Sequence, residues 1–414
     1  MQKVILVGLK EKLSDIELEF SLLELEKLAN VLEFKVLDRV IQNNNIINFA
    51  TYIGSGKVIE IANIVDTLDI DIVIFDTTLS PAQIKNLSKR IKAVIWDRSF
   101  LILQIFALKA KSNEAKLEVA LAQKEYLYPR LTGMYDSLSR QGGSGYNAKG
   151  PGETKLELDR RKIKTQITAL KKELLIIHKK RNITKQKRTN SGIKTVALVG
   201  YTNAGKSSLI NAIANHLNTE TPEVEVKNQV FATLDTKFKR VKKPWFPPFL
   251  LIDTVGFISK LPIELVNSFR STLQDALNAD LIIHVIEAIG DIKKEISVTL
   301  ETLSTINCDN IERILVVTKK DLMVIPPLID DPYFLVSNKT NEGIDELIIQ
   351  IYNYILSDYT TKTIIIPFDK GEVLANIQNN YQIHELLYLE EGVKLTFSAP
   401  VSIINNIIND ITKI

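Results

Sequence analysis

Eight consecutive residues near the middle of the chain restrict its fold more than any other stretch. Gly200–Ser207 read G-Y-T-N-A-G-K-S and match the phosphate-loop pattern G-x-x-x-x-G-K-[ST]. The apolar, β-branched run Thr195–Val199 predicts a buried strand before the loop, and the spacing of Ser208–Ile213 predicts a helix after it. The alternative is a chance glycine turn with a surface lysine, which would require neither the strand before it nor the helix after it. The stretch therefore predicts an α/β fold with a helix N-terminus that faces an anion.

Each residue type in this loop suits contact with phosphate. Gly200 and Gly205 allow the backbone to curl around the anion without Cβ clashes. Lys206 brings a cation to the β- and γ-phosphates, which predicts a catalytic role, and the Ser207 hydroxyl is placed to ligate Mg²⁺. The residues expected to bind the nucleotide here are Gly200, Tyr201, Thr202, Asn203, Ala204, Gly205, Lys206, Ser207 and Ser208.

Length and composition narrow the class of protein. A chain of 414 residues is too long to fold around a single hydrophobic core, which suggests about two to four domains. The single cysteine, Cys308, excludes a disulfide framework and a cysteine-based metal site, which fits a reducing compartment. The apolar part of Met1–Gly8 is too short for a signal peptide, and no apolar run reaches membrane-spanning length. We expect a cytoplasmic monomer with no membrane-spanning segment and no DNA partner.

Residues 1–111 alternate short apolar runs with helical patterns, which predicts a parallel α/β domain. Ser80 and Pro81 are typical of a helix start. The expected strands are Val4–Val7, Phe34–Leu37, Ile72–Phe75 and Val94–Trp96, and the clearest helices are Ile16–Leu32 and Pro81–Ile91.

A second glycine–lysine stretch, Gly54–Lys57, also precedes a helical pattern. It lacks the spaced first glycine, and Val58 stands where a magnesium ligand would be needed. We interpret it as a plain glycine turn and keep a second phosphate loop as the alternative.

Residues 112–190 predict an antiparallel helical hairpin. The apolar face of the first helix contains Leu117, Leu121, Tyr128 and Leu131, and that of the second contains Ile163, Ile167, Leu170, Leu174 and Ile177. Between them, residues 141–153 carry five glycines and a proline. Close approach to a partner explains this density at least as well as a flexible linker.

The second helix of the hairpin is strongly basic. A solvated charged face is the ordinary explanation, but concentration on one hairpin in a chain of net charge +3 favours a phosphate backbone as partner. Lys185, Lys187 and Arg188 continue the charge into an expected linker, and residues 189–192 mark the boundary to the next domain. The helical cations are Lys155, Arg160, Arg161, Lys162, Lys164, Lys171, Lys172, Lys179, Lys180 and Arg181, against Glu157, Asp159 and Glu173.

Residues 191–358 contain the other motifs expected around a phosphate loop. Leu250–Ile252 predicts a strand that ends in D-x-x-G, where Asp253 would hold Mg²⁺ and the Gly256 N–H would meet a γ-phosphate. Thr254 and Val255 complete this motif. Thr233, in the stretch F-A-T-L-D, is a further candidate for catalysis and for a second hydroxyl on Mg²⁺, with an ordinary loop threonine as the alternative.

Two later motifs resemble those with which GTPases recognise guanine. Ile314–Val317 predicts a strand followed by T-K-K-D, which is similar to N-K-x-D: Asp321 would accept from guanine, and Lys319 would lie along the base. Thr318 replaces an amide that usually ties loops together, so we expect weaker nucleotide retention. Ser337, Asn338 and Lys339 resemble the S-A-K element, with asparagine in place of alanine. The order of these strand-end motifs predicts a GTPase domain.

Residues 359–414 predict a small α+β domain without chemistry of its own. The expected elements are a strand at Ile364–Ile366, a helix from Gly371 to Leu389 and a strand at Val393–Phe397.

Taken together, the motifs resemble the HflX family of ribosome-associated GTPases over nearly the whole chain. The resemblance rests on the GTPase motifs, Ile53–Lys57, Asp97–Arg98, Ile102–Ala107, Glu114–Leu117, Gly142–Gly143 and Gly150–Glu157. It implies a Mg²⁺-dependent GTPase that binds the large ribosomal subunit and its rRNA and separates stalled or idle ribosomes. The chain departs from the family at Ser144–Asn147 and at Thr236.

Two other functions stay open. One is a ribosome-associated module that binds GTP but hydrolyses it negligibly. The other is an RNA-remodelling ATPase that uses the N-terminal domain for ATP, although Asp321 argues against ATP in the GTPase domain.

Overall fold

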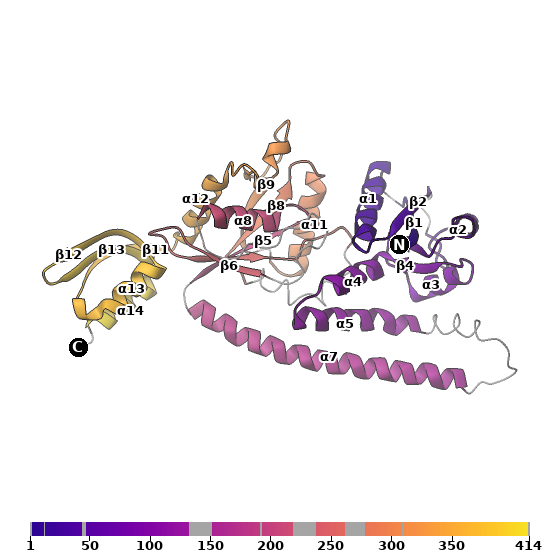
Figure 1. The fold of residues 1–414 in the computed structure, drawn as a ribbon, viewed down its shortest axis with the longest axis horizontal. Helices are drawn as coiled ribbons and strands as arrows, with labels where there is room; N and C mark the ends of the chain where they lie inside the picture. The colour runs from indigo at the N-terminus through magenta and orange to yellow at the C-terminus, as the bar shows by residue number, and fades with distance from the viewer. Residues whose placement is uncertain are drawn as a thin grey trace. The chain divides into compact units, whose positions relative to one another are not determined.

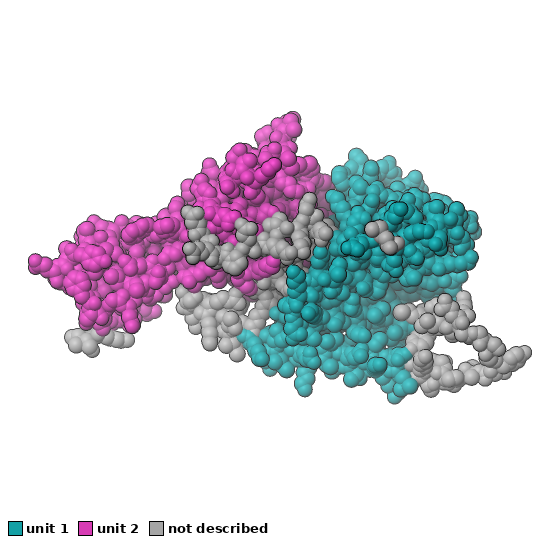
Figure 2. Space-filling model, viewed as in Figure 1, with its two compact units in different colours: residues 1–181, 228–235, 258–272 teal, residues 182–227, 236–257, 273–414 magenta. Residues whose placement is uncertain are grey.

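The computed structural model describes residues 2–11, 13–43, 47–131, 151–190, 193–217, 237–260, 278–308 and 310–412. Its chain forms two compact units, which Figure 2 distinguishes by colour. The first contains residues 1–181, 228–235 and 258–272, and the second contains residues 182–227, 236–257 and 273–414. The division into four domains at residues 111, 190 and 358 stays a prediction.

The N-terminal part of the first unit is a four-stranded sheet in the order β2-β1-β3-β4, with all neighbouring strands parallel. All four predicted strands form, and the first two extend further than predicted. They are β1 (Lys3–Leu9), β2 (Lys35–Gln42), β3 (Ile72–Phe75) and β4 (Val94–Asp97).

Helices cover both faces of this sheet, so its strands are apolar on both sides. Alternate residues of β1, such as Ile5 and Val7, pack with α2 and α3. On the opposite face, Leu18 and Leu22 of α1 lie where a Cβ on Gly8 would meet them. The predicted cap holds, because the Ser80 hydroxyl accepts from the Gln83 N–H. The helices are α1 (Asp15–Val31), α2 (Ser55–Leu68), α3 (Pro81–Ser88) and α4 (Arg98–Lys109).

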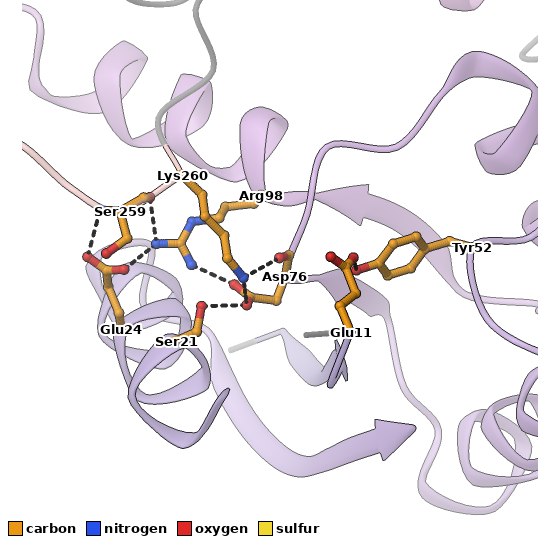
Figure 3. A network of polar contacts seen from close by, with 8 residues as sticks. All are labelled: Glu11, Ser21, Glu24, Tyr52, Asp76, Arg98, Ser259 and Lys260. Carbon is orange, nitrogen blue, oxygen red and sulfur yellow. Dashed lines mark hydrogen bonds and ion pairs between the residues drawn. The ribbon is translucent and has the colours of Figure 1, made fainter. Parts of the chain in front are cut away.

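A buried charge network holds together elements of the first unit that are distant in sequence (Figure 3). Arg98 is 1% exposed; it forms an ion pair with Glu24, and its Nη1 donates to Asp76 at 2.5 Å. Burial raises the pKa of Asp76, but the charges of Arg98 and Lys260 outweigh it and hold that pKa below its ordinary value. The Asp76 carboxylate is therefore ionised, and its charge is compensated locally.

The same network binds residues 258–260, which follow the D-x-x-G motif and belong to the first unit. Arg98 Nη2 donates to the Ser259 carbonyl at 3.1 Å, and Lys260 Nζ donates to Asp76 Oδ2 at 2.6 Å (Figure 3). Ile258 is 1% exposed. No pattern in the sequence indicated that this segment packs with residues more than 150 positions earlier.

The predicted hairpin is present as α5 (Asn113–Leu127), the 3₁₀ turn η1 (Tyr128–Arg130) and α7 (Pro151–Asn190) (Figure 1). Two contacts show its antiparallel sense: Lys171 forms an ion pair with Glu125 at 2.7 Å, whereas His178 Nε2, further along α7, lies 3.6 Å from the earlier Glu114 Oε1. The predicted apolar stripe of α7 faces inward, with Leu174 6% exposed.

The linker expected to contain residues 185–188 is helical there, because α7 continues through Asn190. The start of α7 lies within the predicted glycine-rich stretch, since Pro151 opens the helix, where its missing N–H has no cost. The rest of that stretch, including Gly142–Gly150 and Ser144–Asn147, lies outside the described residues.

The second unit contains a six-stranded sheet in the order β10-β9-β8-β5-β7-β6, in which only β6 is antiparallel to its neighbour. The predicted strands before the phosphate loop, before D-x-x-G and before T-K-K-D all form. The strands are β5 (Lys194–Gly200), β6 (Lys237–Val241), β7 (Phe249–Asp253), β8 (Leu281–Glu287), β9 (Glu312–Thr318) and β10 (Tyr333–Leu335).

Helices cover both faces of this sheet as well (Figure 1). One face, with Val196, Leu198, Ile283 and Val285, packs against α8 (Lys206–His216) and α12 (Ile344–Ile355). The other is covered by α11 (Ile292–Thr305), and the short η2 (Lys320–Leu322) follows β9. This doubly wound sheet confirms the predicted α/β class.

The C-terminal part is a small α+β arrangement, as predicted, but one element was assigned wrongly. The helix expected from Gly371 to Leu389 ends at Asn380, and Gln382–Leu389 forms a strand (β12) that pairs with β13 (Gly392–Pro400). Clustered leucines in β12 imitate a helical period, but pairing with β13 outweighs that local pattern. The other elements are β11 (Tyr359–Ile366), η3 (Phe368–Lys370), α13 (Gly371–Asn380) and α14 (Val401–Thr412).

No helix among the described residues is both long and apolar enough to cross a membrane.

His284 is an unusual core residue on the face of β8 that α11 covers. It is fully buried, and neither ring nitrogen has a hydrogen-bond partner among the described residues. Burial, with smaller contributions from Arg313 and Lys206, lowers the pKa of His284 to about 3. The imidazole is therefore neutral in the folded protein.

This burial predicts a measurable acid sensitivity. Between pH 6.5 and about 3 the unfolded state binds a proton that folded His284 does not, so stability falls as the pH falls, by about 1.4 kcal/mol per pH unit. His284→Leu should remove this part of the loss. Thermal unfolding of both proteins at pH 7.5 and pH 5 measures it, with the more exposed His216→Gln as control. An equal decline in wild type and His284→Leu would contradict the assignment.

Candidate functional site

The predicted site residues gather at one edge of the six-stranded sheet. Gly200, Asp253, Glu287 and Thr318 are the last residues of β5, β7, β8 and β9. These strands are parallel neighbours, so their carboxyl ends lie at the same edge. Ligands of open α/β sheets bind outside this edge.

The phosphate loop has the backbone conformation that its glycines allow. Gly200 and Gly205 have φ values of 149° and 90°, and Asn203, with φ 66°, is also left-handed. A Cβ on Gly200 would lie 2.0 Å from the carbonyl oxygen of Val285. The loop therefore requires glycine at this position for space as well as for conformation.

Lys206 lies under the loop rather than on the surface. It is 7% exposed, and its Nζ donates to the carbonyls of Gly200 at 3.0 Å and Tyr201 at 2.8 Å. Burial lowers the pKa of Lys206 to about 8, although Asp253 and Glu295 oppose the shift. At neutral pH the site thus contains a mostly protonated lysine with little water around it.

The two predicted magnesium ligands that the structure describes lie next to each other. Ser207 Oγ donates to Asp253 Oδ2 at 2.7 Å, and Asp253 is fully buried. A hydroxyl and a carboxylate beside a phosphate loop are the hard oxygen donors that Mg²⁺ prefers, so these residues fit the ion. Thr233, the third predicted ligand, and Thr236 lie outside the described residues.

The end of the D-x-x-G motif packs directly on the phosphate loop. A Cβ on Gly256 would lie 2.8 Å from Thr202 Cα and 3.0 Å from Lys206 Nζ. The Phe257 N–H donates to the Gly200 carbonyl at 3.0 Å, and the Thr202 N–H donates to the Phe257 carbonyl at 2.8 Å. The Phe257 side chain is 2% exposed, so it is part of the core.

The two predicted base-recognition segments are joined by side-chain contacts. Ser337 Oγ donates to Asp321 Oδ1 at 2.7 Å, which orients that carboxylate. Lys319, with φ 61°, forms an ion pair with Glu287. Lys339 lies at the exposed end of the S-N-K segment.

Thr318 differs from expectation, because its side chain does tie loops together. It is fully buried, and its hydroxyl donates to the Ala204 carbonyl at 2.7 Å. Asn338 reaches the same loop: its Nδ2 donates to the Gly205 carbonyl at 3.2 Å. Both departures from the usual motifs are visible in the sequence, but nothing in the sequence connects them.

Sequence reasoning missed two carboxylates in this region. Glu287 ends β8, a strand that was not predicted, and the rule that ligands lie at strand ends would have indicated it. Glu295 Oε2 accepts from the Glu287 N–H at 3.2 Å, and burial raises the pKa of Glu295 to about 7. Lys319 and Lys206 both act on the Glu295 charge.

The second glycine–lysine stretch has ordinary helix-start geometry. Gly54 is the N-cap of α2, and its N–H donates to Gln42 Oε1 at 2.8 Å. Lys57 forms an ion pair with Glu60 at 2.8 Å, within the same helix. Both groups that would meet a phosphate are thus engaged within the protein.

Three family profiles match successive parts of the chain. They are described as GTP-binding GTPase N-terminal (residues 19–107), GTP-binding GTPase Middle Region (residues 109–188) and 50S ribosome-binding GTPase (residues 195–320).

Among solved structures, the chain is similar to a GTP-binding protein from Sulfolobus solfataricus in complex with GDP. The identity is 24% and the TM-score 0.44, over 86% of this chain and 99% of that one.

Curated relatives match at higher identity. GTPase HflX of Caldanaerobacter subterraneus subsp. tengcongensis is 38% identical over 95% of this chain and 90% of its own length. GTPase HflX of Escherichia coli (strain K12) is 36% identical over 84% and 83%. With the phosphate loop, D-x-x-G and the base-recognition segments at one sheet edge, these matches show that the chain belongs to the HflX family of GTPases.

Proposed function

We propose that this GTPase depends on Mg²⁺, binds the large ribosomal subunit, hydrolyses GTP faster there and separates stalled or idle ribosomes into subunits. The observation that supports the nucleotide part best is the meeting of the Lys206, Asp253 and Asp321 segments at one sheet edge. The basic helix α7 supports the ribosomal part. We also propose that the protein is a monomer of the cytoplasm.

In the proposed site, Lys206 and the loop N–H groups of residues 203–207 bind the β- and γ-phosphates. Ser207 and Asp253 would hold Mg²⁺, which neutralises phosphate charge when bound. The Gly256 N–H would meet the γ-phosphate, and Thr233 would add a further ligand and order the site. Each of these groups stabilises charge that develops during phosphoryl transfer.

The free protein should hydrolyse GTP slowly. A side chain that orients the attacking water contributes to catalysis in many GTPases, and the buried Phe257 cannot donate to water or accept from it. We therefore expect a partner to stimulate GTP hydrolysis at this site. If the ribosome produced no stimulation and basal turnover were negligible, the protein would be a GTP-binding module instead.

The ribosomal proposal rests on the charge of α7. Lys162, Lys164, Lys172 and Lys179 are exposed, and no ion pair of theirs is present among the described residues. Such cations are available for the rRNA phosphate backbone. The family profile over residues 195–320, described as a 50S ribosome-binding GTPase, points to the same partner.

The phosphate site predicts large catalytic losses from small substitutions. Lys206→Ala removes the buried cation and Ser207→Ala removes a magnesium ligand, so each should lower turnover roughly 10²–10³-fold. Phosphate release with saturating large subunits is the measurement. Lys57→Ala, in the other glycine–lysine stretch, is the matched control and should stay within about twofold of wild type. If Lys57→Ala were the damaging change, the N-terminal ATPase alternative would gain support.

The base site predicts a change of nucleotide. Asp321→Asn should weaken GTP and favour xanthosine triphosphate, whose C2 carbonyl can accept from the new amide, and the discrimination can reach roughly 10⁴-fold. Competitive titration of both nucleotides measures it. The exposed Asp330→Asn serves as control, and an unchanged preference for GTP in Asp321→Asn would mean that another residue recognises the base.

The basic helix predicts salt-dependent ribosome binding. Changing Lys162, Lys164, Lys172 and Lys179 to alanine should weaken binding to large subunits, because fewer phosphates are neutralised. The slope of log affinity against log salt should become shallower by roughly 0.7–0.9 for each phosphate that the variant no longer binds. Binding titrations at several salt concentrations measure this slope.

The matched control for this variant replaces four exposed lysines elsewhere, Lys27, Lys89, Lys293 and Lys362. Equal effects of the two sets would show that net charge, rather than α7, mediates binding. Basal hydrolysis without ribosomes should be the same in both proteins.

A further inference from the structure

Two side chains from different loops lie against the last glycine of the phosphate loop. A Cβ on Gly205 would be 3.2 Å from Asn338 Nδ2 and 3.4 Å from Thr318 Oγ1. Thr318 comes from the end of β9, and Asn338 follows β10. Both segments also carry residues of the proposed base site, so this is where the base side and the phosphate side of the site meet.

The two side chains bond to consecutive carbonyls. Thr318 Oγ1 donates to Ala204 O at 2.7 Å, the nearer of two carbonyls within its reach, the other being Ile286 O at 3.1 Å. Asn338 Nδ2 donates to Gly205 O at 3.2 Å. The Asn338 Oδ1 is buried and has no hydrogen-bond partner in the described part of the chain, so the bond to Gly205 is the one that positions this amide.

These bonds help to set the direction of two amide groups. A trans peptide is planar, so each carbonyl points opposite to the N–H of the next residue. Because the Ala204 carbonyl points toward Thr318, the Gly205 N–H of the same peptide points away from Thr318. The Gly205 carbonyl also accepts from the Leu209 N–H at 2.8 Å, in the first turn of α8, so the bond from Asn338 adds to a direction that the helix sets, with the Lys206 N–H on the opposite side. Both N–H groups belong to the set proposed to bind phosphate.

The residue types suggest an exchange of roles between the two loops. In the usual motifs the residue at position 318 is asparagine and that at 338 is alanine. This chain has a shorter side chain at 318 and a longer one at 338, and the amide is on the opposite loop. A hydroxyl offers one donor and an amide offers two, so the pair together supplies donors for both carbonyls.

We propose that Thr318 and Asn338 act as one positioning pair, in which Asn338 supplies the amide that position 318 lacks. The pair holds the phosphate loop against the base-recognition segments and slows nucleotide release. This inference rests on the proposed binding of guanine nucleotides in this site. It replaces the expectation that Thr318 by itself leaves the nucleotide loosely held.

A residue-exchange cycle tests the pair. The proteins are wild type, Asn338→Ala, Thr318→Asn and the double variant, which restores the usual asparagine and alanine. The rate at which fluorescent GDP is displaced by excess GDP is measured for each. Asn338→Ala should release GDP about 3- to 10-fold faster, because one net hydrogen bond is lost. Thr318→Asn should also release it faster, because Asn338 already fills the space beside Gly205.

The decisive result is the double variant. Two independent local effects would multiply, so GDP release would be faster than in either single variant. A positioning pair predicts recovery to within about twofold of wild type. Asn376→Ala, an exposed asparagine of α13, is the control and should not change release. Unchanged release in Asn338→Ala, or multiplied effects in the double variant, would overturn the proposal.

A measurement without nucleotide separates this inference from the proposed function. Thermal unfolding of the same four nucleotide-free proteins should show the same non-additive recovery, because the bonds lie within the protein. If wild type failed to bind GDP, the proposed function would be wrong while the unfolding cycle still tested the pair. Additive unfolding shifts would show that the two side chains do not act together.

Discussion

The nucleotide site depends on one backbone approach, that of Gly200 to the carbonyl of Val285. A single added carbon atom would lie 2.0 Å from that oxygen, too close for any side chain. Because β5 can therefore lie against β8 up to its last residue, the chain turns sharply there, and Lys206 returns beneath the turn to contact the carbonyls of Gly200 and Tyr201. The D-x-x-G segment then closes on the same turn through Phe257. Steric exclusion at one glycine thus sets the geometry around which the charged groups are arranged.

Buried charge is compensated differently around Arg98 and around Lys206. Arg98 has carboxylates on two sides, and the pKa of Asp76 stays below its ordinary value. Lys206 and Glu295 are buried with less compensation, and burial shifts the pKa of each in the direction that favours its neutral form. Charges that lie against opposite charges favour a fixed structure, whereas partly compensated charges can interact with an anion that binds later. This difference distinguishes the structural network around Arg98 from the candidate ligand site around Lys206.

The sequence predicted local features well and long-range ones poorly. The strand before the phosphate loop, the Ser80 cap and the α7 stripe follow from periodicity and residue type, and all are present. The strand β12 was mistaken for helix because its leucines fit either period, and only its pairing with β13 decides between them. The sequence did not reveal Arg98 as the centre of a buried charge network or Glu287 as a partner of Lys319, because folding brings these partners together. The bond from Asn338 to Gly205 joins residues 133 positions apart, a relation that neither segment's motif contains.

The path of the chain through residues 257–260 bears on whether the nucleotide domain can be separated from the first unit. Phe257 belongs to the second unit, and the next three residues belong to the first, where Ile258 is buried and Ser259 and Lys260 meet Glu24, Asp76 and Arg98. A nucleotide domain excised at its N-terminal boundary would therefore keep an apolar residue and a lysine whose packing partners remain on the discarded piece. In such a fragment Ile258 would lose its packing partners and Lys260 its bond to Asp76.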